Sequence, residues 1–186
     1  MGYAVAAAAL AAGAQVTLVS GPTALRPPFG ARLVRIETAA ELQAAVLEAL
    51  PTADAVVMAA AVADYRPATV APSKLKKQDT GPTMTLELVQ NPDVLASIVA
   101  AKRPGTVVVG FKAETGDAVA AAVRMRLDKG LDLVVANDVS EPGSGFGSYT
   151  DRVSIVSSGG TETLPLLPKT EVARRLVATI AKRLGA

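Results

Sequence analysis

The sequence predicts an α/β protein in which a doubly wound, mostly parallel sheet carries helices on both faces. Short apolar runs typical of buried strands alternate with helical patterns along most of the 186 residues. Half of the chain is hydrophobic but only 3% is aromatic, so Ala, Val and Leu supply the apolar surface. The length fits a single domain over 1–186 with a sizeable core.

The first third of the chain contains two helices and three strands. Gly13 ends the first helix, and Gly21-Pro22 ends the first strand. Thr38, with Glu41 three residues later, forms a capping-box pattern before the second helix. The expected elements are a helix over 2–12, strands over 15–20 and 32–36, a helix over 38–50 and a strand over 55–60.

Residues 62–83 are rich in Pro and Lys and predict a long, ordered flap loop, of a length that is usually functional. An alternating strand over 85–89 follows, and Asn91-Pro92-Asp93 then opens a helix with Pro92 near its first position. The remaining expected elements are a strand over 106–111, a helix over 117–129, a strand over 131–136, a Gly/Ser loop over 141–150, an antiparallel hairpin of 152–156 and 161–167, and a helix over 169–184.

The chain contains neither Cys nor His, and this absence removes several chemistries. A Ser-His-Asp triad, a cysteine nucleophile, an imidazole base and a His/Cys zinc site are all excluded. Any metal must therefore be a hard, oxygen-bound cation such as Mg²⁺. The lack of Cys also fits a cytosolic protein.

The charge and the apolar runs indicate neither nucleic acid nor membrane as a partner. There are 19 basic and 17 acidic residues, a net charge of +2, which is too balanced for a nucleic-acid surface. Charges, Gly or Pro interrupt every apolar run before the roughly 18 to 20 residues that a membrane helix needs. Residues 4–12 are Ala-rich but lack the basic start and cleavage site of a secretory peptide.

One acid and a group of lysines follow the predicted strand that ends near Met58. They are Asp64 and then Lys74, Lys76 and Lys77. Ligands of α/β sheets bind beyond the carboxyl ends of the strands, and this combination suits a metal-bound phosphate ligand. The simpler alternatives are a turn hydrogen bond for Asp64 and a solvated basic loop for the lysines.

Other candidates also have two interpretations each. The start of the helix at 91–95 could bind an anion through backbone amides or simply be capped. Phe111 could stack on a base or pack in the core. Lys129 could reach a ligand, although a cation is favoured in the last turn of any helix. Asn137 and Asp138 follow a strand and form either a site pair or a turn.

Two common nucleotide-binding patterns are missing. The P-loop pattern G-x-x-x-x-G-K-[ST] does not occur. The run Gly143-Ser-Gly145-Phe-Gly147 has the wrong last interval for the dinucleotide fingerprint, and no helix is expected after it. None of the three Tyr residues has the Lys four positions later that a short-chain dehydrogenase needs.

Several segments, taken in chain order, form a specific set: Val19-Ser-Gly-Pro22, Ala59 to Pro67, Ser73 to Lys77, Asn91-Pro-Asp93, Val109-Gly-Phe111, Ala113-Glu-Thr115, Lys129 and Ala136-Asn-Asp-Val-Ser140. The set covers nearly the whole chain and resembles the phosphopantothenoylcysteine synthetase family, the CTP-using bacterial phosphopantothenate–cysteine ligases. In that family this domain is usually the carboxy-terminal half of a bifunctional protein, behind a flavin-dependent decarboxylase.

The resemblance implies a Rossmann-like fold and a cytoplasmic ligase of coenzyme A synthesis. CTP would activate the carboxylate of 4'-phosphopantothenate as an acyl-cytidylate, and the amine of L-cysteine would then displace CMP. The resemblance also implies Mg²⁺ with CTP, no flavin in this domain, and a homodimer with the flap near the partner subunit. Such chemistry needs charge neutralisation more than a protein nucleophile, which suits a chain without His or Cys.

The resemblance further implies roles for individual residues. Lys74 meets the triphosphate and the reacting carboxylate and is the catalytic candidate, while Asp64 handles the metal or polar groups of CTP. Phe111 packs against the cytosine or its sugar, and Lys129 adds a cation. The other predicted CTP-binding residues are Met58, Ala59, Ala60, Pro92, Asp93, Val94 and Leu95, with weaker candidates at Ala136, Asn137 and Arg126.

Two departures from the family pattern affect these expectations. Met125 stands where the family commonly has a second lysine. Either a neighbouring arginine makes the contact that this lysine would make, or the contact is absent. The family's Gly-rich strand and turn, with an Asn that serves the acyl-cytidylate step, should precede Met1. We therefore expect the chain to fold and bind CTP but to turn over poorly, and the added segment to restore activity.

Two other functions compete with the ligase. The first is an NAD(P)-dependent oxidoreductase on a similar sheet, which the missing fingerprint and Tyr–Lys pair disfavour. The second is a non-catalytic dimerising domain. Calorimetric titration with CTP, ATP and NADPH separates the three.

Overall fold

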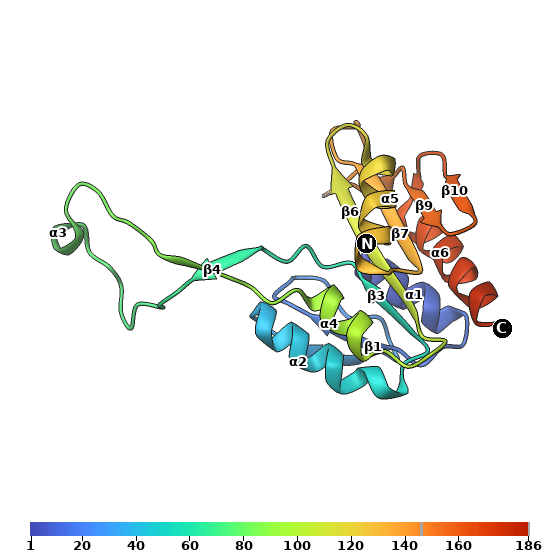
Figure 1. Cartoon of the computed structure of the whole chain (residues 1–186), viewed down its shortest axis with the longest axis horizontal. Coiled ribbons are helices and arrows are strands. Elements are labelled where there is room, and N and C mark those ends of the chain that lie inside the picture. Colours follow the sequence, from blue (N-terminus) through green and yellow to red (C-terminus); the bar gives the residue numbers. More distant parts are fainter. Residues whose placement is uncertain (146, 186) are drawn as a thin grey trace.

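Five strands form the central sheet of this computed structural model, in the order β10-β9-β7-β6-β3. Their bounds are β3 Ala55–Met58, β6 Val107–Glu114, β7 Leu133–Asp138, β9 Ser154–Ser157 and β10 Gly160–Thr163. The strands β3, β6 and β7 are parallel neighbours, whereas β9 runs antiparallel to β7 and β10 (Figure 1). The predicted α/β class and C-terminal antiparallel hairpin are confirmed, and the central sheet is mixed, with two parallel and two antiparallel pairings.

The structure describes residues 1–145 and 147–185. The predicted loop over 141–150 includes Phe146, which lies outside the described residues, as does Ala186. The side chains of Asp79 and Thr80 are also left out of the description. No helix in the described part of the chain combines the length and the apolar character that crossing a membrane demands.

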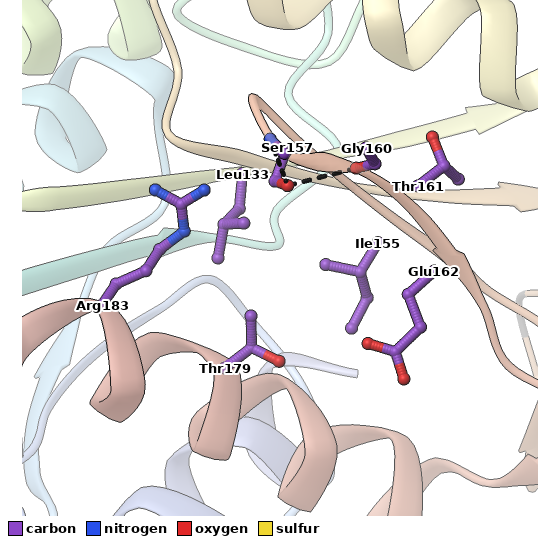
Figure 2. Close-up of a pocket in the computed structure, with 9 residues that line it drawn as sticks. Leu133, Ile155, Ser157, Gly160, Thr161, Glu162, Thr179 and Arg183 are labelled. Atoms are coloured by element: carbon purple, nitrogen blue, oxygen red, sulfur yellow. Dashed lines mark hydrogen bonds between the residues drawn. The ribbon is translucent and has the colours of Figure 1, made fainter.

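The hairpin of β9 and β10 stands beside the last helix, α6 (Lys169–Leu184). Between them lies a cavity of about 240 Å³ at the amino ends of the parallel strands (Figure 2). Leu133 and Ile155 line it from the sheet, and the exposed side chains of Glu162 and Arg183 lie on opposite sides of it. A short ladder of β8 (Thr150–Asp151) with β11 (Leu167–Pro168) precedes α6.

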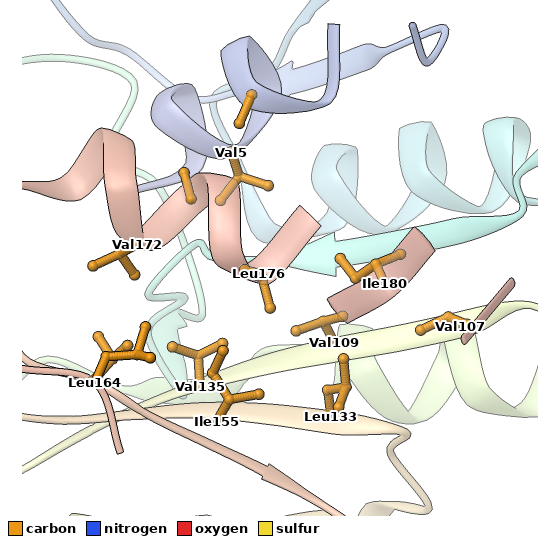
Figure 3. Close-up of a cluster of buried hydrophobic side chains, with 13 residues drawn as sticks. Val5, Val107, Val109, Leu133, Val135, Ile155, Leu164, Val172, Leu176 and Ile180 are labelled. Carbon is orange, nitrogen blue, oxygen red and sulfur yellow. The ribbon is translucent and has the colours of Figure 1, made fainter. Parts of the chain in front are cut away.

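Two apolar clusters hold helices on the two faces of the sheet. The first cluster joins α1 (Gly2–Ala11) and α6 to one face, with Leu176 fully buried against β6 and β7 (Figure 3). The second joins α2 (Ala39–Ala49), α4 (Val94–Ala101) and α5 (Ala118–Lys129) to the other face. Successive strand residues alternate between the two clusters, as the pleat requires.

Strands β1 (Thr17–Ser20) and β2 (Arg32–Arg35) pair in parallel, as a two-stranded sheet of their own within the described residues. The sequence predicted both strands but not this separation from the larger sheet. The Tyr3 hydroxyl lies 2.9 Å from Ser20 Oγ and links the pair to α1. Val19 packs against the second cluster, so the pair shares the core that covers the central sheet.

Capping side chains fix where the helices begin. The predicted capping box of Thr38 and Glu41 is present at α2, which runs into a short 3₁₀ turn, η1 (Leu50–Thr52). At α4 the Asp93 carboxylate accepts from Ala96 N at 3.0 Å. Asp93 is therefore the N-cap, and Pro92 lies two residues before Val94, the first helical residue, rather than in the first turn as the sequence suggested.

The predicted flap is part of a longer hairpin arm over 61–91 that projects away from the sheet (Figure 1). Its two strands, β4 (Tyr65–Pro67) and β5 (Leu88–Gln90), pair with each other. A single-turn helix, α3 (Lys77–Thr80), lies near its outer end. The strand predicted over 85–89 is thus observed over Leu88–Gln90, shorter and displaced toward the C-terminus, and it belongs to the arm rather than to the central sheet.

Asp132 should make the stability of the fold depend on acid pH. Its Oδ2 accepts from Lys102 Nζ and from Val108 N, both at 2.8 Å. Burial alone raises the pKa of Asp132, but the hydrogen bonds from Lys102 and then Val108 outweigh it and hold the pKa below 3.8. A carboxyl group whose pKa is lower in the folded than in the unfolded chain stabilises the fold at pH values above its unfolded pKa. This contribution is lost as the pH falls through the folded pKa.

We therefore expect Asp132→Asn to lower Tm at neutral pH. The difference in Tm from wild type should shrink as pH falls below about 3.8. Circular dichroism melts of both proteins across that range measure it. A constant difference at every pH would contradict this account of Asp132.

Candidate functional site

The carboxyl ends of β3, β6 and β7 meet at one edge of the sheet, where the sequence placed the site. Strand β6 pairs with β3 only as far as Met58↔Gly110, so β6 continues past the end of β3. Ala59 and Ala60 follow β3 there, and a Cβ on Gly2 of α1 would lie 3.6 Å from Ala59 Cβ. Small side chains thus leave room beside the extended part of β6, next to the start of α1.

Phe111 and Asn137 lie on the same face of this edge. Phe111 is half-buried and packs against the first cluster, the one under α1 and α6. Asn137 follows two residues after Val135, which belongs to the same cluster, so the pleat directs both side chains to that face. In the register of β6 and β7, Phe111 pairs with Val135 and Ala113 with Asn137. The two side chains are therefore diagonal neighbours.

Four predicted CTP-binding residues contribute their side chains to the core or pack against it. Met58 and Val94 are 8% and 4% exposed and belong to the second cluster, against which Leu95 packs. Ala136 is 1% exposed. The side chains of Met58, Val94 and Ala136 are therefore buried, whereas that of Leu95 is half-buried.

Asp93 and Lys129 form an ion pair at the start of α4. The Asp93 carboxylate also caps the helix, so it occupies the position where an anion would meet the backbone amides. Burial acts to raise the pKa of Asp93, but the hydrogen bond from Lys129 and then that from Ala96 N outweigh it and hold the pKa below 3.8. The sequence suggested capping and anion binding separately, and the structure shows the capping.

Asp64 lies at the base of the arm, where Asn91 joins the two arm strands. Asn91 N donates to Asp64 O at 2.7 Å, and Asn91 Nδ2 donates to Ala63 O at 2.8 Å. The Asp64 side chain is exposed. Among residues 1–145 and 147–185, no three acidic side chains gather closely enough to hold a metal ion by themselves.

Lys74 does not lie at this edge. It is exposed, and the segment between β4 and α3 that carries it lies in the outer part of the arm (Figure 1). Met125, at the position of the expected second lysine, packs against the second cluster. Arg126 is half-buried, and its Nε is buried without a hydrogen-bond partner in the described structure.

A small cavity of about 160 Å³ lies at the same edge, between the start of α5 and the end of β7. Asn137, Asp138 and Arg152 are among the residues that line it. A hydrogen bond from the Ser140 hydroxyl, followed by one from Ser140 N, lowers the pKa of Asp138. The larger cavity beside α6 is at the opposite edge, and at about 240 Å³ it is smaller than the roughly 300–1,000 Å³ typical of ligand pockets.

Sequence reasoning missed a polar network beneath Asn137. The Asp151 carboxylate, 5% exposed, accepts from Ser144 Oγ at 2.6 Å, Gly145 N at 3.2 Å and Asn137 Nδ2 at 3.4 Å. Lys169 Nζ donates to Gly145 O at 2.6 Å from the start of α6. The only signal in the sequence was an acid that follows a Gly/Ser loop.

The sequence is similar to those of known proteins over nearly its whole length. The model of the DNA/pantothenate metabolism flavoprotein C-terminal domain matches residues 1–184. The coenzyme A biosynthesis bifunctional protein CoaBC of Vibrio vulnificus is 42% identical over 100% of this chain and 46% of its own length. CoaBC of Escherichia coli is 44% identical over 98% of this chain and 45% of its own length. The chain thus spans about half the length of the curated relatives it matches.

Solved structures give the same picture. The C-terminal domain of CoaBC superposes with a TM-score of 0.81 at 34% identity, over 99% of this chain and 82% of that one. A flavoprotein from Streptococcus pneumoniae has a TM-score of 0.80 at 21% identity, over 97% and 86% of the two chains. A Cab2 mutant in complex with phosphopantothenate-cysteine has a TM-score of 0.63 at 17% identity, over 84% and 55%. The last two show the fold alone.

Proposed function

Because the chain belongs to the family of DNA/pantothenate metabolism flavoprotein C-terminal domains, we propose that it joins 4'-phosphopantothenate to L-cysteine with CTP. The observation that carries the proposal is the identity to CoaBC proteins along nearly the whole chain. We assign the protein to the cytoplasm, associated with a flavin-dependent decarboxylase, since the relatives are bifunctional proteins of coenzyme A biosynthesis.

The reaction has two steps. The carboxylate of 4'-phosphopantothenate attacks the α-phosphate of CTP, and an acyl-cytidylate forms as pyrophosphate leaves. The amine of L-cysteine then attacks the acyl carbon, loses a proton as the amide forms, and displaces CMP. Both steps need a site that positions the reactants and neutralises phosphate charge.

The nucleoside would lie on the face of Phe111, in the room left by Ala59 and Ala60. Phe111 offers a half-buried ring for stacking, and Asn137 offers polar groups beside it. The triphosphate would extend toward the start of α4, where it competes with Asp93 for Lys129. Release of Lys129 from Asp93 would place a cation on the phosphates.

Mg²⁺ bound with CTP supplies further charge neutralisation, and Asp64 is the carboxylate that suits it. A single exposed carboxylate is an ordinary ligand for a Mg²⁺ whose other ligands are phosphate oxygens and water. Lys74 would complete the site when the arm of a second copy of the chain lies over this edge, and there it would meet the reacting carboxylate and the triphosphate.

A second copy of the chain is the partner that we propose for the arm. Six large apolar side chains of the arm are more than half exposed: Tyr65, Val70, Leu75, Met84, Leu86 and Leu88. Such a concentration of exposed apolar surface is typical of a protein interface. In a homodimer the same side chains are covered, and the arm of one protomer can reach the partner.

Calorimetric titration with three nucleotides tests the function. The ligase predicts saturable binding of CTP and weaker binding of ATP. Binding of NADPH in place of CTP would favour an oxidoreductase, and no binding of any of the three would favour a dimerising domain. Formation of CMP that requires both 4'-phosphopantothenate and L-cysteine would complete the assignment.

Lys129→Met should weaken CTP binding by about tenfold to a hundredfold, because a charged hydrogen bond to phosphate contributes roughly 1.5–3 kcal/mol. Its effect on Tm should be small, since the pair with Asp93 is partly exposed and such pairs contribute at most about 1 kcal/mol. Calorimetry and thermal melts give both quantities.

Lys102→Met is the matched control. Lys102 also pairs with an aspartate, Asp132, but at the opposite edge of the sheet. Its loss should lower Tm and leave CTP affinity unchanged. Equal CTP affinity in Lys129→Met and wild type would remove Lys129 from the proposed site.

A further inference from the structure

Asp151 connects Ser144 and Gly145 to the end of β7. Its Oδ1 accepts from Ser144 Oγ at 2.6 Å and from Gly145 N at 3.2 Å. The carboxylate is 5% exposed, and Ser144 is 7% exposed. A buried acid with several donors fixes its surroundings, because each donor loses its partner if the carboxylate moves.

The same oxygen decides which way the amide of Asn137 points. A carboxylate oxygen can accept hydrogen bonds but cannot donate them. Asn137 therefore turns its donor, Nδ2, toward Asp151 Oδ1 at 3.4 Å. The two ends of an amide are otherwise nearly interchangeable in shape, and only its partners set its orientation. Asn137 Oδ1 therefore faces away from Asp151.

The position of Asn137 relates this orientation to a nucleotide base. Asn137 shares the face of Phe111 on the neighbouring strand and is its diagonal neighbour. A base stacked on Phe111 would bring one of its edges toward β7, where Asn137 lies. A carbonyl oxygen there accepts from an amino group and repels a carbonyl oxygen.

We propose that Asp151 is a positioning residue for base selection: it fixes the amide of Asn137 so that the carbonyl oxygen accepts from the amino group of cytosine. The inference rests on the proposed function, and it concerns which pyrimidine nucleotide the site accepts. UTP carries a carbonyl oxygen where CTP carries the amino group, so the fixed amide favours CTP over UTP.

The test is the ratio of CTP to UTP affinity in wild type and in Asp151→Asn. Asparagine at position 151 has nearly the same shape, but its own amide can donate to Asn137 and let Asn137 reverse. We expect wild type to bind CTP at least about tenfold more tightly than UTP. In Asp151→Asn the ratio should fall to about threefold or less, with UTP binding tightened and CTP binding weakened.

Asp132→Asn is the matched control, because Asp132 is a half-buried aspartate with two donors at the opposite edge of the sheet. It should lose stability but keep the wild-type ratio. Asn137→Ala leaves the hydrogen bonds of Asp151 with Ser144 and Gly145 in place, and it should also abolish the preference for CTP over UTP. This second variant tests the proposal even if Asp151→Asn does not fold.

The outcomes separate this inference from the function. If wild type binds no pyrimidine nucleotide, the proposed function fails. If wild type prefers CTP and both Asn137→Ala and a folded Asp151→Asn keep that preference, the function stands and the positioning role of Asp151 is overturned. If the CTP-to-UTP affinity ratio fell equally in Asp151→Asn and in Asp132→Asn, the positioning role of Asp151 would also be overturned, because a general loss of stability would explain both changes.

Discussion

Replacing Lys74 by alanine should lower the rate of acyl-cytidylate formation by about 10²–10³-fold, the loss expected when one charge-stabilising donor is removed from a transition state. The free energy of unfolding should change by less than about 0.5 kcal/mol, because the side chain is exposed on the arm. Single-turnover assays with enzyme in excess over CTP measure the rate even where multiple turnover is slow.

Lys182→Ala provides the control for Lys74, since Lys182 is an exposed lysine of α6, at the far side of the sheet from the arm. Its rate should equal that of wild type. The catalytic role of Lys74 would be lost if Lys74→Ala formed the intermediate as fast as wild type. A loss confined to CTP affinity, with an unchanged rate at saturation, would reduce Lys74 to a binding residue.

Replacing Leu86 and Leu88 together by aspartate should convert a dimer into a monomer. These side chains are 59% and 53% exposed, so their replacement removes no contact within one protomer that the core needs. Two charges placed in an apolar interface would each be left unpaired there, and dimerisation should weaken by at least about 10³-fold. Sedimentation at several protein concentrations measures the change, and thermal melts confirm that the monomer is folded.

Leu127→Asp is the corresponding control, because Leu127 is 63% exposed but lies on α5 rather than on the arm. It should sediment as wild type does. A wild-type protein that is monomeric throughout, or a dimer that persists in the double variant, would contradict the role of the arm.

The helices were predictable because local side chains specify their ends. Thr38 and Glu41 start α2, and Gly130, in the left-handed conformation, ends α5. The partner of the strand near 85–89 was not predictable, because alternating residues look the same in a central sheet and in an exposed arm. Strand pairing depends on contacts distant in sequence, which a local pattern does not contain.

The same distinction applies to the site. The convergence of Ala59, Phe111 and Asn137 followed from the rule that parallel strands end at one edge. The pair of Asp93 with Lys129 joins residues 36 apart in the chain, and the contact of Asp151 with Asn137 joins residues 14 apart. Neither contact has a local signature, so the structure was needed to find them.

The most direct test of the proposed site is a crystal structure of the protein with CTP and Mg²⁺. The account predicts a base against Phe111, the triphosphate between Lys129 and the base of the arm at Asp64, and the Asn137 carbonyl oxygen within hydrogen-bond distance of the cytosine amino group. CTP bound instead in the cavity beside Thr179 and Arg183, or no CTP bound at saturating concentration, would contradict it.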